Sequence, residues 1–124
     1  MATGLENLKI YQMAKELEIE VYKITNNFPT DEKFRSVDQL RRSSSSATNN
    51  IAELYNKQSI KEKIHILRDI AISEAEENRS NLLICAIKGF ANKSALDNLA
   101  ERYRELMKAT NGYIRFLKTD KPTN

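Results

Sequence analysis

Small and apolar residues recur every three or four positions through most of this chain, and this spacing constrains the fold more than any other feature. The clearest stretch covers residues 34–57, where the repeat consists of Val37, Leu40, Ser44, Ala47, Ile51 and Leu54. Steps of three and four place these residues along one face of an α-helix. Because several of them are Ser or Ala, the pattern predicts a neighbouring helix packed closely against this face.

Three further stretches carry the same repeat. The first contains Ile10, Ala14, Leu17, Val21, Ile24 and Phe28. The second contains Ile60, Ile64, Leu67, Ala71, Ala75, Leu82, Cys85 and Gly89. The third contains Leu96, Leu99, Tyr103, Leu106, Thr110, Ile114 and Leu117. With only three Gly and two Pro in 124 residues, few positions favour turns, so the chain is predicted to form a few long helices.

Sequence signals also predict where the helices begin. Thr30 follows Pro29 and precedes two acids, which suit the positive end of a helix dipole. Ser or Thr followed three residues later by an acid is a capping box, and it occurs at Thr3 and Glu6, at Ser59 and Glu62, and in weaker form at Ser94 and Asp97. The predicted helices are residues 4–27, 31–57, 60–89 and 95–118, with 119–124 as a frayed tail.

Short connections make consecutive helices antiparallel neighbours, and a repeat near 3.5 residues favours shallow packing angles. The sequence therefore predicts an all-α fold, an antiparallel up-down-up-down four-helix bundle, as a single domain over residues 1–124. Additional apolar residues flank the main stripes, and we interpret them as a subunit interface, with a thick core as the alternative: Leu8, Tyr11, Tyr22, Ile66, Ile70, Ile84 and Ile87.

Composition excludes several classes of protein. A single cysteine, Cys85, rules out an internal disulfide and a multi-cysteine zinc site. No apolar run reaches the roughly 18 residues of a membrane helix, and the N-terminal residues lack a signal-peptide core. We therefore expect a cytoplasmic protein without a membrane partner. The formal net charge of +3 gives only a mild preference for anionic partners.

The second stretch also resembles a known family. Residues 39–46, QLRRSSSS, and residues 50–53, NIAE, are similar to the Q-L-R-R-A-x-x-S-x-x-x-N-I-A-E signature of four-helix-bundle proteins encoded in intervening sequences of 23S ribosomal RNA. Phe28-Pro29, followed by Glu32 and Phe34, is similar to the turn that precedes this signature. Departures occur as well, since Leu54 stands where the family has Gly, and Ser73-Glu74 replaces a Gly-Ser pair.

The resemblance implies a bundle that assembles as a ring-shaped homopentamer. The architecture is also similar to that of accessory proteins of diversity-generating retroelements, which bind nucleic acid and a reverse transcriptase. For the ribosomal RNA group itself, the biochemical role is not established. By analogy, the resemblance implies a non-enzymatic role linked to RNA.

Basic residues provide the first candidate site. In the last predicted helix they recur at steps of four, seven and three, which places them on one face: Arg104, Lys108, Arg115 and Lys118. The second helix adds Arg41, Arg42 and Lys57. Such side chains neutralise phosphates without reading bases, so they predict salt-sensitive binding to RNA or DNA with little sequence preference. The alternatives are an ordinary solvated helix face and a surface for an acidic protein.

Polar residues in the middle of the bundle provide the second candidate site. Asn50, Glu53 and Glu77, with Glu74 and Arg41 nearby, are interpreted as a buried hydrogen-bonded network that fixes helix register. The alternative is a carboxylate metal site. Di-iron bundles need two Glu-x-x-His motifs, however, and Glu62 with His65 forms the only one here. We therefore expect no metal and no other cofactor.

Catalysis has little support in the sequence. The run Ser43 to Ser46 lacks the Gly-x-Ser-x-Gly turn that exposes a nucleophile, and the chain has a single histidine, His65. We predict no catalytic residues, and we predict an oligomer that binds nucleic acid through its basic helix faces. The alternatives are an adaptor for an acidic protein or a reverse transcriptase and, third, a carboxylate-metal enzyme.

Overall fold

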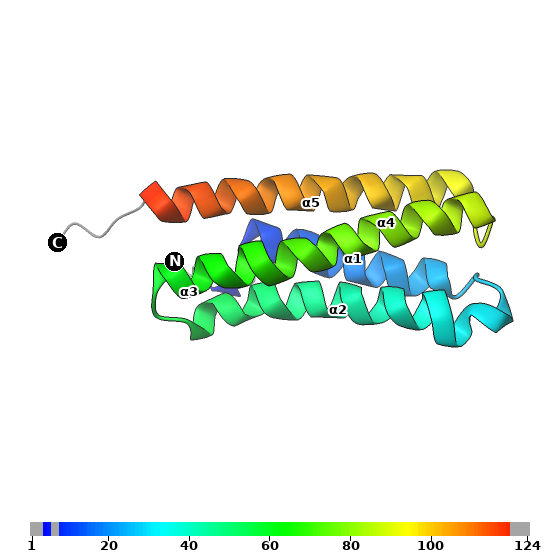
Figure 1. Cartoon of the computed structure of the whole chain (residues 1–124), viewed down its shortest axis with the longest axis horizontal. Helices are drawn as coiled ribbons and strands as arrows, with labels where there is room; N and C mark the ends of the chain where they lie inside the picture. Colours follow the sequence, from blue (N-terminus) through cyan, green and yellow to red (C-terminus); the bar gives the residue numbers. More distant parts are fainter. Residues whose placement is uncertain (1–3, 6–7, 120–124) are drawn as a thin grey trace.

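A computed structural model of the chain describes residues 4–5 and 8–119, and this part of the chain forms four antiparallel helical rods without a strand (Figure 1). The first rod is α1, Lys9–Thr25. The second consists of a 3₁₀ turn Thr30–Glu32, a π-helical segment Lys33–Val37, α2 at Asp38–Ala52 and a 3₁₀ turn Glu53–Asn56. The third consists of α3 at Ile60–His65, a π-helical segment Ile66–Ala71 and α4 at Ile72–Lys88. The fourth is α5, Lys93–Thr119. The predicted all-α four-helix fold is confirmed.

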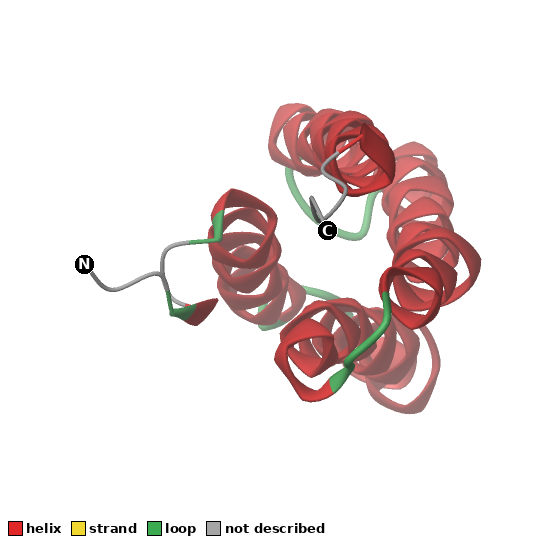
Figure 2. Ribbon diagram, turned by 90° about the vertical axis from the view of Figure 1, so that its left-hand side faces the viewer, coloured by secondary structure: helices red, strands yellow, loops and turns green. Residues whose placement is uncertain are grey.

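Each rod lies against two others around a common core. The contacts join α1 to α2, α2 to α4, α4 to α5, and α5 back to α1. The end-on view in Figure 2 shows the rods arranged around this core. As a result, α2 and α5 lie diagonally across the bundle, and their outer faces form separate surfaces.

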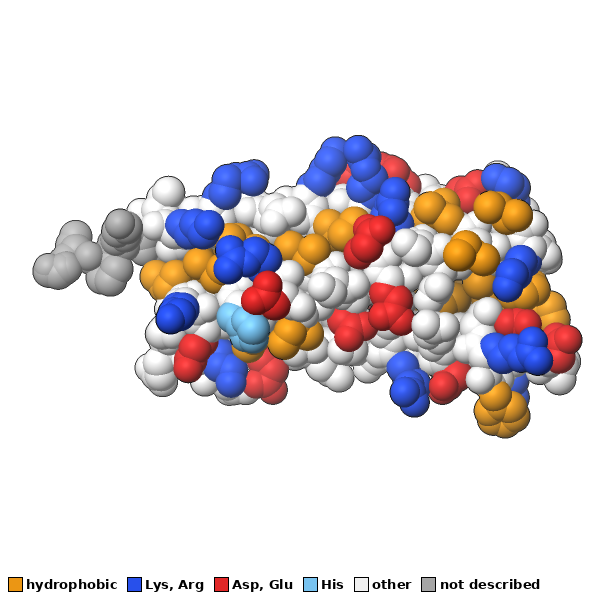
Figure 3. All heavy atoms as spheres, viewed as in Figure 1, with side chains coloured by type: hydrophobic (Ala, Val, Ile, Leu, Met, Phe, Trp, Pro, Cys, Tyr) orange, Lys and Arg blue, Asp and Glu red, His pale blue; other side chains and the backbone are white. Residues whose placement is uncertain are grey.

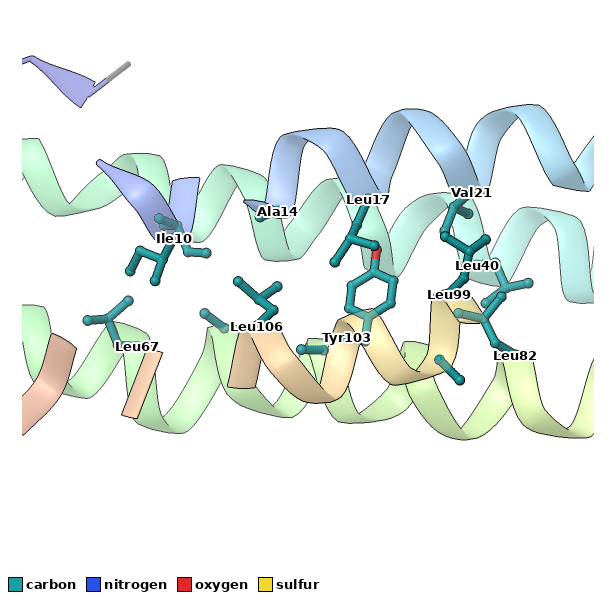
Figure 4. Packing of buried hydrophobic residues seen from close by; sticks show 14 of the residues in the cluster. Ile10, Ala14, Leu17, Val21, Leu40, Leu67, Leu82, Leu99, Tyr103 and Leu106 are labelled. Atoms are coloured by element: carbon teal, nitrogen blue, oxygen red, sulfur yellow. The ribbon is translucent and has the colours of Figure 1, made fainter. Parts of the chain in front are cut away.

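The predicted inward stripes form the core (Figure 4). Every residue of the stripes in the second and fourth rods is buried, and so are most of those in the other two rods. Ile24 and Ile60 are only half-buried, and Gly89 is exposed. The small-residue face of α2 packs closely on α1 as predicted, since the Thr48 hydroxyl donates to the backbone carbonyl of Ala14 over 3.3 Å.

The structure confirms one of the predicted helix caps and shows a different cap for the last helix. Ser59 caps α3 as predicted, because its Oγ accepts from the backbone N–H of Glu62 over 3.0 Å. The prediction for the last helix is wrong by two residues. Asn92 is the capping residue there, with Oδ1 2.9 Å from the backbone nitrogen of Ala95, while Ser94 lies inside α5. Asn92 can take this place because Asn caps a helix N-terminus as well as Ser does.

At both ends of the chain, part of the predicted structure lies outside the described residues. The capping box at Thr3 and Glu6 lies outside the described residues, and α1 begins at Lys9. Residue 119 belongs to α5, whereas the rest of the predicted tail, residues 120–124, is not described. None of the described helices is long and apolar enough to span a bilayer.

The turn from α4 to α5 depends on Gly89. Its φ of 76° is a left-handed conformation that favours glycine. The backbone N–H of Gly89 donates to Ala86 and that of Phe90 donates to Cys85, which is a Schellman motif. This reversal places α5 directly beside α4.

The predicted buried polar network is wrong. Glu53 and Glu77 are exposed, and Asn50 is half-buried with its Nδ2 donating to the carbonyl of Ser46 in its own helix, 2.8 Å away. Glu77 accepts instead from Gln39 Nε2, over 3.0 Å at the surface. These residues lie on the solvent side of the seam between the second and third rods, outside the inward stripe.

A different polar cluster lies inside the bundle. Asn78 is completely buried, and its Oδ1 accepts a hydrogen bond from the Ser43 hydroxyl. The Asn78 side chain lies beside the hydroxyl of the buried Tyr103, but Asn78 Nδ2 and this hydroxyl form no hydrogen bond of regular geometry with the described residues. Burial raises the pKa of the Tyr103 hydroxyl above its ordinary value. Since Asn78 occupies the heptad position between Ala75 and Leu82, it could have been predicted as an inward residue.

Candidate nucleic-acid interface

The four basic residues predicted for the last helix lie exposed along one side of α5, and we call them the α5 basic face: Arg104, Lys108, Arg115 and Lys118. They span residues 104–118, a rise of about 21 Å along the helix. In Figure 3, Lys and Arg side chains line the edge of the molecule formed by α5. The sequence therefore placed these residues on a common surface.

Most of the α5 basic face is available to a ligand. Arg104 forms an ion pair with Glu101, with Nη1 3.2 Å from Oε2, and both side chains are about half exposed. Within the described part of the chain, Lys108, Arg115 and Lys118 form no ion pair. An exposed pair of this kind stabilises a helix little and exchanges readily for a phosphate.

Arg41 lies apart from this face and is engaged at the C-terminal end of α1. Its Nε donates to the Thr25 hydroxyl over 2.9 Å, and its Nη2 donates to the Tyr22 carbonyl and to Asn26 Oδ1 over 3.1 and 2.9 Å. The guanidinium also lies 4.1 Å from the centre of the Tyr22 ring. A cation that binds the last carbonyls of a helix stabilises its negative end, so Arg41 joins α2 to α1.

Arg42 lies in acidic surroundings. Its Nε is 3.9 Å from Asp38 Oδ2, and both side chains are exposed. They line a surface furrow of about 530 Å³ between α2 and α4, together with Gln39, Ser43, Ser46, Glu74 and Glu77. Three carboxylates against one guanidinium make this furrow electronegative, which opposes phosphate binding there.

Lys57 also lies next to acids. It is half-buried and lines a second furrow of about 530 Å³ on the same side of the molecule, with Asn50, Glu53, Glu62, His65, Ile66 and Ile70. The three predicted basic residues of the second rod are thus separated from the α5 basic face. The candidate phosphate-binding surface therefore consists of the α5 basic face, without the three basic residues that the sequence predicted on the second rod.

Comparison with known proteins places the chain in a family. Residues 6–112 match the family described as 23S rRNA-intervening sequence protein. The chain belongs to this family. A crystal structure of a protein of unknown function from the S23 ribosomal protein family of Bacteroides thetaiotaomicron is similar, with a TM-score of 0.75 and 23% sequence identity over 86% of this chain and 98% of that one. At this identity the likeness shows the fold alone. No curated protein matches the chain.

This member of the 23S rRNA-intervening sequence protein family has no group of three or more His, Cys, Asp or Glu side chains arranged for a metal among its described residues. His65 Nδ1 lies 2.7 Å from Asp69 Oδ2, one turn further along the chain. The exposed pair sits on the outer surface of the third rod. Its two side chains are too few to hold a metal by themselves.

The serine run of this family member is engaged in helix packing. Ser43 donates to the carbonyl of Gln39 as well as to Asn78, and Ser44 donates to the carbonyl of Arg41 over 3.1 Å. Both serines are buried. Among the described residues, no carboxylate or histidine forms a hydrogen bond with either hydroxyl, so the arrangement favours close approach of helices rather than nucleophilic chemistry.

Proposed function

We propose that this protein is a non-enzymatic, cytoplasmic, nucleic-acid-binding bundle that contacts the phosphate backbone of RNA or DNA through the α5 basic face. The observation that carries the proposal is the set of four exposed cations on one side of a single helix, three of them without an ion pair among the described residues. The family's name, 23S rRNA-intervening sequence protein, makes RNA the first ligand to test.

The salt dependence of binding tests this proposal. Four phosphate contacts on a single strand give a slope of about −3 for the logarithm of the association constant against that of the salt concentration. Fluorescence anisotropy with a short labelled RNA between 50 and 300 mM salt measures this slope, and a strand of scrambled sequence serves as the control. Equal binding of both strands and a slope of about −3 or steeper are expected. Binding that does not change with salt, or no binding at 50 mM, would contradict the proposal and favour an acidic protein as partner.

We also propose that the bundle self-associates, and the family resemblance suggests a ring of five copies. Support comes from the outer face of α4, where Ile84 and Ile87 are 49% and 79% exposed. Figure 3 shows hydrophobic side chains gathered at the right-hand end of the molecule, where α4 ends. A second copy would remove them from water, and a ring would multiply the α5 basic face and raise its avidity for a long RNA.

Size-exclusion chromatography coupled to light scattering measures the assembly. The expected particle has five times the mass of the 14.3 kDa chain. Ile87→Glu should shift it to smaller species because the substitution buries a charge in the contact. Lys88→Glu, at the neighbouring exposed position, is the control and should leave the mass unchanged. A single chain at every concentration of the unmodified protein would refute self-association.

A further inference from the structure

A groove of about 410 Å³ lies between α3 and the last turns of α5. Its floor is aliphatic, consisting of the buried Ile64 and Leu117 and the half-buried Ile60. Its rim is basic, and the three cations there are Lys61, Arg68 and Lys118. Figure 3 shows hydrophobic side chains (orange) between Lys and Arg side chains (blue) at the left-hand end of the molecule, where α5 ends.

The rim carries an excess of positive charge. Lys61 and Lys118 form no ion pair among the described residues. Arg68 Nε lies 3.7 Å from Asp69 Oδ1, but the other oxygen of this carboxylate is 2.7 Å from His65 Nδ1. Among the described residues, Asp69 is therefore the only acid paired with a cation of the rim, and of the three rim cations it pairs with Arg68 alone. A ligand that matches both floor and rim presents apolar surface between anionic groups.

The groove continues the α5 basic face. Lys118 belongs to both, and Arg115 lies one turn before it on the same side of the helix. A nucleic-acid backbone that follows α5 would therefore reach the groove at this end of the bundle. An unpaired nucleotide fits the two requirements, because it carries a flat, largely apolar base between two phosphates. A duplex keeps its base faces stacked and presents only its backbone.

We propose that this groove seats an unpaired base of single-stranded RNA or DNA on Ile60, Ile64 and Leu117, with the flanking phosphates on Lys61, Arg68 and Lys118. The inference rests on the proposed phosphate binding and narrows its ligand to single strands. Aliphatic side chains contact any base face without reading its edge. The site therefore distinguishes single strand from duplex, and it does not select a base.

The test compares three ligands that carry the same number of phosphates: a short single strand, a duplex, and a single strand of abasic nucleotides. Anisotropy titrations at low salt give the affinities for the unmodified protein and for Ile60→Ser. This variant changes a half-buried position in the first turn of α3 and retains every charge of the rim. Ile19→Ser is the matched control, because Ile19 is 48% exposed on α1 and away from the groove.

The expected result is that the unmodified protein binds the base-bearing strand roughly fivefold or more tightly than the abasic strand or the duplex. Ile60→Ser should lose this preference, and Ile19→Ser should keep it. Equal affinity for base-bearing and abasic strands, or a preference that survives Ile60→Ser, would overturn the inference while phosphate binding stands. Failure of all three ligands to bind would overturn the proposed function itself.

Discussion

Replacing Arg104, Lys108 and Arg115 by Glu is expected to abolish RNA binding while the bundle remains folded. Each substitution removes one cation from the α5 basic face and places a negative charge opposite a phosphate. Removing three of four phosphate contacts and adding three repulsions should weaken binding at least about a hundredfold at low salt. All three positions are exposed, so the free energy of unfolding should change by no more than about 0.5 kcal/mol at each.

The control for this variant changes the net charge equally at another surface. Lys9, Lys15 and Lys23 are exposed on α1 and lie outside the α5 basic face. Their replacement by Glu should reduce RNA affinity only slightly, through the overall field of the protein. If the two triple variants lose affinity equally, net charge rather than the α5 basic face governs binding. If the α5 variant still binds, another surface makes the contact.

The largest expected loss of stability comes from Asn78→Asp. Asn78 is fully buried, and the substitution replaces a neutral amide by a carboxyl of the same shape. At pH 7 the folded protein must either bury a carboxylate or keep it protonated, and the hydroxyls of Ser43 and Tyr103 beside it offset only part of this cost. We expect the free energy of unfolding to fall by about 3 kcal/mol or more.

The same variant should show a distinctive pH dependence. Burial raises the pKa of the introduced carboxyl in the folded state above the value of about 3.9 in the unfolded chain. The folded state then binds more protons than the unfolded state, so stability rises as the pH falls from 7 toward 4. Urea unfolding across this range measures the effect, with Asn98→Asp at an exposed position of α5 as the control. A loss equal to that of the control would show that Asn78 is not enclosed.

The helical repeat predicted the fold because burial follows residue spacing directly. A residue such as Leu40 or Leu106 is buried wherever its stripe faces the core, and the structure agrees for these positions. Asn78 has the spacing of an inward residue, but a polar side chain adds nothing to an apolar repeat, so the repeat did not predict its burial. For Ser94, two adjacent capping signals competed, and spacing alone does not decide between Ser94 and Asn92.

The candidate site was less predictable because the side chains of Arg and Glu reach several neighbours. Sequence spacing brought the α5 cations together on one face, since they share a single helix. It did not show that Arg41 reaches across to Thr25 and the end of α1, because that contact depends on how α1 and α2 pack. The groove beside Lys118 was missed for the same reason, as α3 and α5 meet there only in the folded chain.

Photo-crosslinking detects directly whether the α5 basic face contacts the nucleic-acid backbone. Asn111 is exposed in the middle of this face, between Lys108 and Arg115. A photoreactive side chain introduced there should crosslink to bound RNA at low salt and lose the crosslink at high salt. The same group at the exposed Ser73, on α4, is the comparison. Strong crosslinking at position 111 and little at position 73 is the predicted result. Crosslinking at position 73 alone would show that RNA binds elsewhere and not at the α5 basic face.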